Sequence, residues 1–212
     1  MIFTLLIILI DYIFLLYASS RLYVNKLQGF IVSKLVYMSA FSPVLLNIFG
    51  MVTNIGTVIY GSVMVAQCII MKKYGLQTAV KVLQTALYIL FMMVLTGLAL
   101  STLPILAGNE VFALATKDLL VFSPQSIFGS FCAFIISQNL LVFTFKKLKL
   151  NFALKSFIAI LLAQVVDSLI FFSIAFYNIP NWASIMLDGF ILKVCLTVIF
   201  LPILYLIEYD KV

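Results

Sequence analysis

The chain has 212 residues, of which 65% are hydrophobic and 9% charged, and its formal net charge is +6. Soluble domains carry about 25% charged residues, so a water-soluble globular fold is excluded because no core could hide this much apolar surface. Histidine is absent, and the three cysteines lie in apolar stretches without a CxxC pair. These absences argue against a structural zinc site, a disulfide scaffold and the commonest general base.

Seven apolar segments follow one another, most of them about as long as a membrane-crossing helix of about 20 residues. Their length and their lack of strict alternation predict helices rather than barrel strands. The first has no preceding basic residue and no clear cleavage site, so we interpret it as a retained span rather than a signal peptide. The fifth contains Pro124, which is an alternative starting point for the helix of that segment. The segments are 2–19, 28–49, 54–72, 77–105, 119–145, 152–177 and 185–207.

Basic residues occur mainly on one side of this series of segments. Positive charge marks cytoplasmic loops, so the pattern predicts seven spans with the N-terminus outside and the C-terminus inside. The net charge follows from this topology, and no nucleic-acid partner is expected. We therefore predict an all-α, polytopic helical bundle forming one integral domain over 1–212 in the inner (cytoplasmic) membrane. The basic residues on the predicted inner side are Arg21, Lys26, Lys72, Lys73, Lys81, Lys146, Lys147, Lys149, Lys155 and Lys211.

Four ionisable residues lie well within the predicted spans: Asp11, Lys34, Asp167 and Lys193. Lys34 is about two turns from the cytoplasmic end, where its side chain can snorkel to the interface. Asp11 is deeper, and a structural partner or a position at the rim of a site is expected for it. Spans six and seven should form an antiparallel hairpin, which places Asp167 and Lys193 at a matched depth of roughly 12–15 Å.

A charge in the middle of a bilayer is costly unless it faces a partner, water or the protein interior. Gln164 and Phe171 share the helix face of Asp167 because they lie three residues before and four residues after it. Two interpretations of Asp167 remain open: an ion pair with Lys193 that merely holds spans six and seven together, or a polar ligand site. Amides and hydroxyls in the spans act either as interhelical bonds or as the lining of a wet centre. They are Asn47, Asn54, Gln67, Gln125, Ser130, Ser137, Gln138 and Asn139.

Four stretches resemble the queuosine precursor transporter family, also called the vitamin-uptake transporter type. They are "NIFGMVTNIGTVIYGSVMVAQCIIMKKYGLQTA" (47–79), "PQSIFGSFCAFIISQNLLVFTFKKLK" (124–149), "LLAQVVDSLIFFSIAF" (161–176) and "ILKVCLTVIFLPILY" (191–205). The third is similar to the family pattern Gln-x-x-Asp-(Ser/Thr)-x-x-Phe. The chain departs from the family by carrying Cys68, Lys72 and Leu141 at usually acidic positions, and Gln125 at a usual arginine.

The resemblance implies import of a queuosine precursor, either a 7-deazaguanine-type base or queuine. Such a base has two adjacent N–H donors beside a carbonyl, and the carboxylate of Asp167 can accept both donors. Lys193 would keep that carboxylate ionised and oriented, while glutamines donate to the carbonyl and aromatic rings stack on the base. The candidate substrate-binding residues are Asp167, Gln164, Gln138, Lys193, Phe171, Asn47, Tyr60 and Gln67.

Other functions remain open: the substrate-binding membrane subunit of an ATP-driven vitamin importer, a carrier of a related vitamin or nucleobase, or a purely structural protein. The first segment lacks the four-residue spacing of small residues with which such subunits dock a partner. Without histidine, HExxH or a Gly-x-Ser-x-Gly elbow, an enzyme is not expected. The expected partners are a 7-deazapurine base and the lipid bilayer, with no cofactor and no metal.

Overall fold

The computed structural model describes the backbone of residues 2–21, 23–41, 44–102 and 110–209. Within these ranges the chain forms seven α-helices and one β-hairpin, joined by short connections. The helices are α1 (Ile2–Arg21), α2 (Val24–Phe41), α3 (Ile55–Lys73), α4 (Gly75–Thr102), α5 (Glu110–Lys147), α6 (Phe152–Ala175) and α7 (Trp182–Tyr209), and the strands are β1 (Leu45–Ile48) and β2 (Met51–Asn54).

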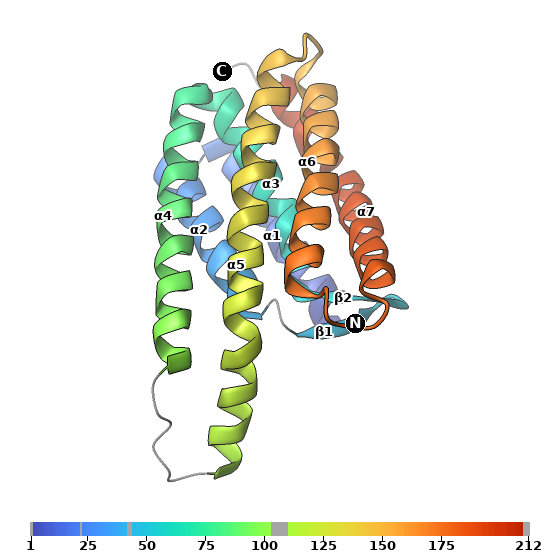
Figure 1. Ribbon diagram of the computed structural model, residues 1–212. Helices are drawn as coiled ribbons and strands as arrows, with labels where there is room; N and C mark the ends of the chain where they lie inside the picture. Colours follow the sequence, from blue (N-terminus) through green and yellow to red (C-terminus); the bar gives the residue numbers. More distant parts are fainter. Residues whose placement is uncertain (1, 22, 42–43, 103–109, 210–212) are drawn as a thin grey trace.

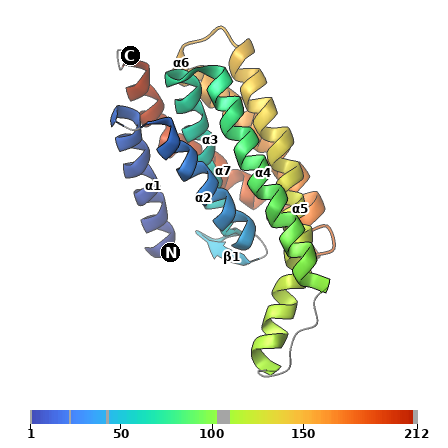
Figure 2. The same cartoon turned by 90° about the vertical axis from the view of Figure 1, so that its left-hand side faces the viewer.

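The helices run alongside one another in a single bundle with α3 inside it (Figures 1 and 2). All residues of α3 from Gly56 to Met71 are buried, so this helix contacts protein on every side. The hairpin and the start of α1 lie at one end of the bundle, and the end of α7 lies at the other (Figure 1). A helix surrounded by protein in this way can carry polar side chains without exposing them to lipid.

Five of the described helices are long and apolar enough to cross a membrane: α3, α4, α5 from Gln125, α6 and α7. In α1 the apolar stretch Thr4–Ala18 is shorter. The chain is therefore a polytopic helical membrane protein. The count of seven spans and the orientation stay predictions. Of the charges that predict orientation, the side chains of Arg21, Lys117 and Lys211 lie outside the described residues.

Local sequence signals explain several helix ends. Asn54 caps α3 by accepting a hydrogen bond from the backbone N–H of Thr57, and Asn151 caps α6 in the same way through Leu154. Asparagine is a preferred N-cap because its side-chain oxygen satisfies a backbone donor that has no partner within the helix. Gly75 adopts φ +84° and turns the chain from α3 into α4.

The second predicted span, 28–49, is wrong in its C-terminal part. The helix ends at Phe41, and β1 then pairs with β2 in antiparallel register. Phe49 and Gly50 have φ of 55° and 85°, which are the left-handed conformations required by a tight hairpin turn. Pro43, which follows the helix in the sequence, disfavours its continuation. The all-α prediction therefore needs this small sheet added to it.

The fifth helix also differs from its prediction. It begins at Glu110, before both the apolar boundary at 119 and Pro124. Apolar composition marks where lipid contact begins, whereas a helix continues as long as its backbone groups remain bonded. A proline removes one donor without always ending a helix, and Pro202 likewise lies inside α7.

Candidate functional site

Asp167 of α6 and Lys193 of α7 form an ion pair inside the bundle. The Nζ atom of Lys193 lies 2.7 Å from Oδ2 of Asp167 and donates a second hydrogen bond to Oγ of Ser168 at 2.9 Å. Asp167 is 7% exposed and Lys193 is 3% exposed. This contact confirms that α6 and α7 form the predicted antiparallel helical hairpin, with the two charges at matched depth. Because water is largely excluded, each charge depends on the other for compensation.

A chain of hydrogen bonds connects this pair to α3 and α5. Ser137 donates to Oδ1 of Asp167 at 3.3 Å, and the hydroxyls of Tyr60 and Ser137 lie 2.7 Å apart. Nε2 of Gln138 donates to the Tyr60 hydroxyl at 3.2 Å. An ionised carboxylate only accepts hydrogen bonds, so Ser137 donates to Asp167 and in turn accepts a hydrogen bond from the Tyr60 hydroxyl. These hydrogen bonds from α3 and α5 therefore orient the carboxylate of Asp167.

A small cavity borders the ion pair. It offers about 20 Å³ to the centres of water molecules, which is room for about one water. Side chains from five helices and the end of β2 surround it, so both charges and two aromatic rings face one space. The lining residues are Met38, Asn54, Gly56, Thr57, Tyr60, Ser130, Ala133, Asp167, Phe171 and Lys193.

Four of the eight predicted site residues line this cavity: Asp167, Lys193, Tyr60 and Phe171. Lys193 also lies 5.5 Å from the centre of the Tyr60 ring, a distance at which a cation is attracted to an aromatic face. The side chains that the sequence placed on separate spans therefore share one space. A carboxylate, an ammonium and aromatic faces in a dry space suit a planar ligand with N–H donors.

Gln138 and Gln164 lie one layer behind the cavity. Gln138 reaches the site only through the Tyr60 hydroxyl. Gln164 donates to Thr197 at 2.8 Å, and Thr197 donates to the backbone carbonyl of Lys193 at 2.9 Å. The two glutamines therefore support residues that face the cavity. A direct contact of either amide with a ligand would require a rearrangement.

The structure places Asn47 and Gln67 away from the cavity. The side chain of Asn47 is exposed and accepts the backbone N–H of Gly50, which stabilises the hairpin turn. Gln67 is buried and donates to the carbonyl of Ala79, which joins α3 to α4. These are the structural roles that amides often have in membrane helices. The wrong helical assignment for 45–48 explains why Asn47 looked like a buried amide.

The sequence prediction missed two features of the cavity wall. Thr57 lies one helical turn before Tyr60, and its hydroxyl donates to Asn54 at 3.1 Å; this spacing was a usable signal. Met38 reaches the cavity because Gly56 has no side chain: a Cβ on Gly56 would lie 2.7 Å from Cγ of Met38. That contact joins α2 to α3 and has no signature in sequence.

A second ion pair, with a buried carboxylate and a partly exposed lysine, links α1 and α2 beside α3. Lys34 of α2 pairs with Asp11 of α1, and Ser62 of α3 donates to the same carboxylate at 2.7 Å. Lys34, which the sequence places near the cytoplasmic interface, also has a partner inside the protein, and its snorkelling stays a prediction. The expected structural partner of Asp11 is confirmed. This pair attaches α1 and α2 to the central helix.

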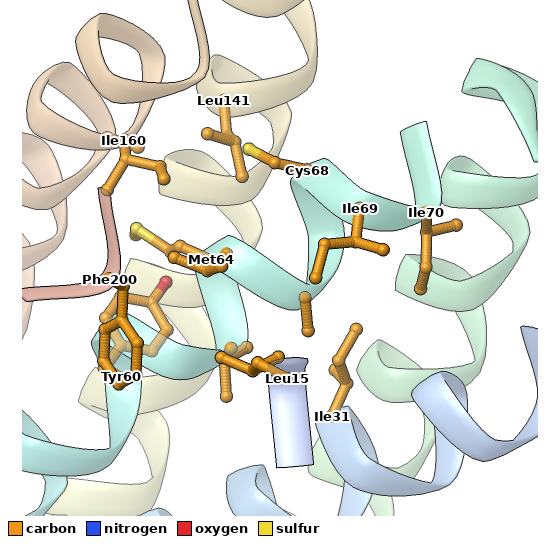
Figure 3. Packing of buried hydrophobic residues seen from close by; sticks show 14 of the residues in the cluster. Leu15, Ile31, Tyr60, Met64, Cys68, Ile69, Ile70, Leu141, Ile160 and Phe200 are labelled. Carbon is orange, nitrogen blue, oxygen red and sulfur yellow. The ribbon is translucent and has the colours of Figure 1, made fainter. Parts of the chain in front are cut away.

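Beyond the first ion pair, away from the hairpin, apolar side chains fill most of the bundle interior, and the buried polar residues Gln67, Ser156 and Gln164 lie among them. Met64, Cys68 and Leu141 are fully buried, and Figure 3 shows Cys68 of α3 beside Leu141 of α5. These include two of the positions where the resemblance led us to expect acidic residues. Close packing here separates the cavity from the lysine-rich end. Among the residues that the structure describes, no cluster of side chains suited to a metal ion occurs.

Comparison with known proteins identifies the chain's relatives. The family model described as "Putative vitamin uptake transporter" matches residues 54–207, which is more than half of the chain. The chain belongs to this transporter family. The matched region begins just before α3, and α1 and α2 precede it. Membership in a transporter family agrees with the expectation that the chain is not an enzyme.

The comparison with curated proteins gives a named relative of this transporter. The chain is 28% identical over 172 residues to the "Probable queuosine precursor transporter" of Bacillus subtilis (strain 168), covering 75% of this chain and 73% of that protein. No solved structure matched. The resemblance inferred from the motifs is therefore confirmed at the level of the family, and the chain is a multi-pass membrane transporter.

Proposed function

We propose that this transporter imports a queuosine precursor, a base of the 7-deazaguanine type, across the inner membrane into the cytoplasm. The observation that carries the proposal is the carboxylate of Asp167, which lines the cavity while Lys193, on the same cavity wall, compensates its charge. A ligand that presents paired N–H donors to such a carboxylate gains charge-assisted hydrogen bonds in a site shielded from water.

The arrangement leaves acceptor capacity for a ligand. Lys193 occupies one site on Oδ2 of Asp167, and Ser137 occupies one on Oδ1. A carboxylate offers about four lone-pair sites, so both oxygens retain a site for a donor from the cavity. The rings of Tyr60 and Phe171 line the same space and supply flat surfaces for a bicyclic base.

Two further observations support this substrate and this direction. The Bacillus subtilis relative is named for transport of a queuosine precursor, and the similarity extends over about three quarters of both chains. In Figure 1, α3 and α5 end and α6 begins at the end of the bundle where α7 ends, opposite the hairpin, and Lys72, Lys73, Lys146, Lys147 and Lys155 belong to these helix ends. By the positive-inside rule the hairpin end faces outward and the C-terminus inward.

The test is uptake by the chain alone. Cells that cannot synthesise queuosine precursors are supplied with a labelled precursor base, and cellular label and queuosine in tRNA are measured. We expect both to appear with the wild-type chain and to be lost at low substrate with Asp167→Asn. The matched control is Glu208→Gln, which also neutralises a carboxylate that accepts a hydrogen bond but is only partly buried and lies at the far end of α7.

Two outcomes would contradict this proposal. A wild-type chain that accumulates in the membrane without restoring uptake would exclude the proposed substrate. Uptake that appears only when ATPase subunits are co-expressed would instead show that the chain serves as the binding subunit of an ATP-driven importer.

A further inference from the structure

The cavity beside Asp167 is too small for the proposed substrate. Its space accommodates about one water molecule, whereas a two-ring base displaces several. Some part of the wall therefore has to move before a ligand enters. Toward the lysine-rich end, fully buried residues such as Met64 and Leu141 fill the interior. The opposite wall, toward the hairpin, is built differently.

The hairpin contributes to that wall through the end of β2. Asn54, the last residue of β2, lines the cavity and caps α3. Thr53 is fully buried, and its hydroxyl lies 2.9 Å from that of Thr57. The turn at the other end, formed by Phe49 and Gly50, is exposed. One end of this small sheet thus closes the cavity while the other projects from the bundle.

One carboxylate of α7 forms a hydrogen bond with the hairpin. Oδ2 of Asp188 accepts the backbone N–H of Val52 at 3.0 Å. The next residue is Gly189, where a Cβ would lie 2.8 Å from the Thr53 hydroxyl, so β2 rests directly on the bare backbone of α7. Within the described part of the chain, Asp188 takes part in neither salt bridge. Its charge-assisted bond to the strand is therefore its main polar interaction there.

The β-hairpin is the part of the cavity wall that can most readily move away from the rest of the bundle. An isolated two-stranded sheet is marginally stable at best, so this one depends on its attachment to α7 and, through Thr53 and Asn54, to the start of α3. The helices that form the other walls are fastened by the pair of Asp167 and Lys193 and by the bonds from Ser137. Among the hydrogen bonds of the described residues, the bond to Asp188 is the one that joins β2 to α7.

We propose that Asp188 is a positioning residue that latches the hairpin over the cavity, and that release of this latch opens the cavity toward the hairpin end of the bundle. Asp188 acts through Val52 and thereby through Asn54, without touching the substrate. The proposal rests on the proposed function for the identity of the substrate, but the latch itself is a property of the cavity wall.

The test measures access to the cavity directly. Ala133, which lines the cavity, is replaced by cysteine in a chain whose three natural cysteines have been changed to alanine. The purified protein is treated with a water-soluble thiol reagent, and the rate of modification is followed. Asp188→Ala should raise this rate about tenfold or more, the equilibrium effect of losing one hydrogen bond to a charged group. Asp188→Asn, which retains a neutral acceptor, should give an intermediate rate.

Glu208→Ala is the matched control. Oε2 of Glu208 accepts the backbone N–H of Ala153 at 3.3 Å, so this change removes the same kind of bond from the other end of α7. It should leave the rate unchanged. If Asp188→Ala folds poorly, Gly189→Ala is the second variant. Its methyl group would crowd the Thr53 hydroxyl of β2 and also the Phe172 ring of α6 without removing a charge, and it should also raise the rate.

Two results separate this proposal from the proposed function. An unchanged modification rate in both Asp188→Ala and Gly189→Ala would overturn the latch, even in a chain whose uptake of the base depends on Asp167. A raised rate in both variants, in a protein whose wild-type chain takes up no precursor base, would support the latch and exclude the substrate.

Discussion

Replacing Lys193 by methionine and Asp167 by asparagine, singly and together, separates a structural ion pair from a ligand-binding carboxylate. Each single change leaves one buried charge without its partner, whereas the double change removes both charges. The cavity and the helix contacts are otherwise retained, because both replacements are close in size to the natural side chains. Stability and transport then respond differently in the two cases.

The structure sets the expected magnitudes. Nζ of Lys193 and Oδ2 of Asp167 are 2.7 Å apart and both residues are almost fully buried. Removing one partner of such a pair costs about 3–5 kcal/mol of unfolding free energy, and replacing both is often nearly neutral. For the ligand, loss of a charged acceptor of paired donors costs about 2–4 kcal/mol, a roughly 30- to 1000-fold loss of affinity.

Two assays read these effects separately. Thermal unfolding in detergent should show both single variants destabilised and the double variant close to wild type. Uptake of labelled precursor base at low concentration should be lost in Asp167→Asn and should stay lost in the double variant, while Glu208→Gln transports normally.

One result would refute the reasoning about the site. A double variant that regains both stability and uptake would show that Asp167 serves only to hold α6 against α7. The substrate site would then have to be sought elsewhere on the cavity wall, beginning with Tyr60 and Thr57.

Three further predictions follow from other contacts. Asp11→Leu should leave Lys34 unpaired and lower the melting temperature in detergent, and adding Lys34→Met should restore most of the loss; an unstable double variant would contradict this. Tyr60→Phe removes the hydroxyl that links Gln138 to Ser137 and Asp167, so it should lower the free energy of unfolding by about 1–3 kcal/mol. Unfolding in denaturant measures this loss, and a loss near zero would argue against the chain of hydrogen bonds. A cytoplasm-only reporter should be active after Lys149 and inactive within 108–117, and activity at both sites would exclude the predicted topology.

Composition was sufficient to predict the membrane class, and the apolar segments located every helix. That information is local, because a stretch of about 20 apolar residues is favoured as a helix in lipid whatever surrounds it. The motif around Asp167 is specific enough to indicate the family by its residues alone. The sequence-based prediction failed at 45–49, where the apolar stretch continues after Pro43 but the chain forms the first strand and the turn of a hairpin against α7.

The pairing of buried charges was predictable only where two consecutive antiparallel helices carry the two residues. Asp167 and Lys193 lie on consecutive antiparallel helices, so equal distance from the connecting loop implies equal depth. Asp11 and Lys34 also lie on consecutive helices, but this lysine is near enough to the predicted interface to snorkel there instead. Its pairing with Asp11, whose carboxylate also accepts a hydrogen bond from Ser62 of α3, was decided only by the tertiary structure.

The order of residues along the chain was enough to establish a helical membrane transporter with a carboxylate of α6 deep within it. Which polar residues meet depended on the packing of the whole bundle. Tyr60 and Phe171 face the cavity with Asp167, whereas Gln67 bonds to α4 and Asn47 stabilises a turn. Helical periodicity specifies the face on which a side chain lies, but the neighbour of that face depends on how helices distant in sequence pack together.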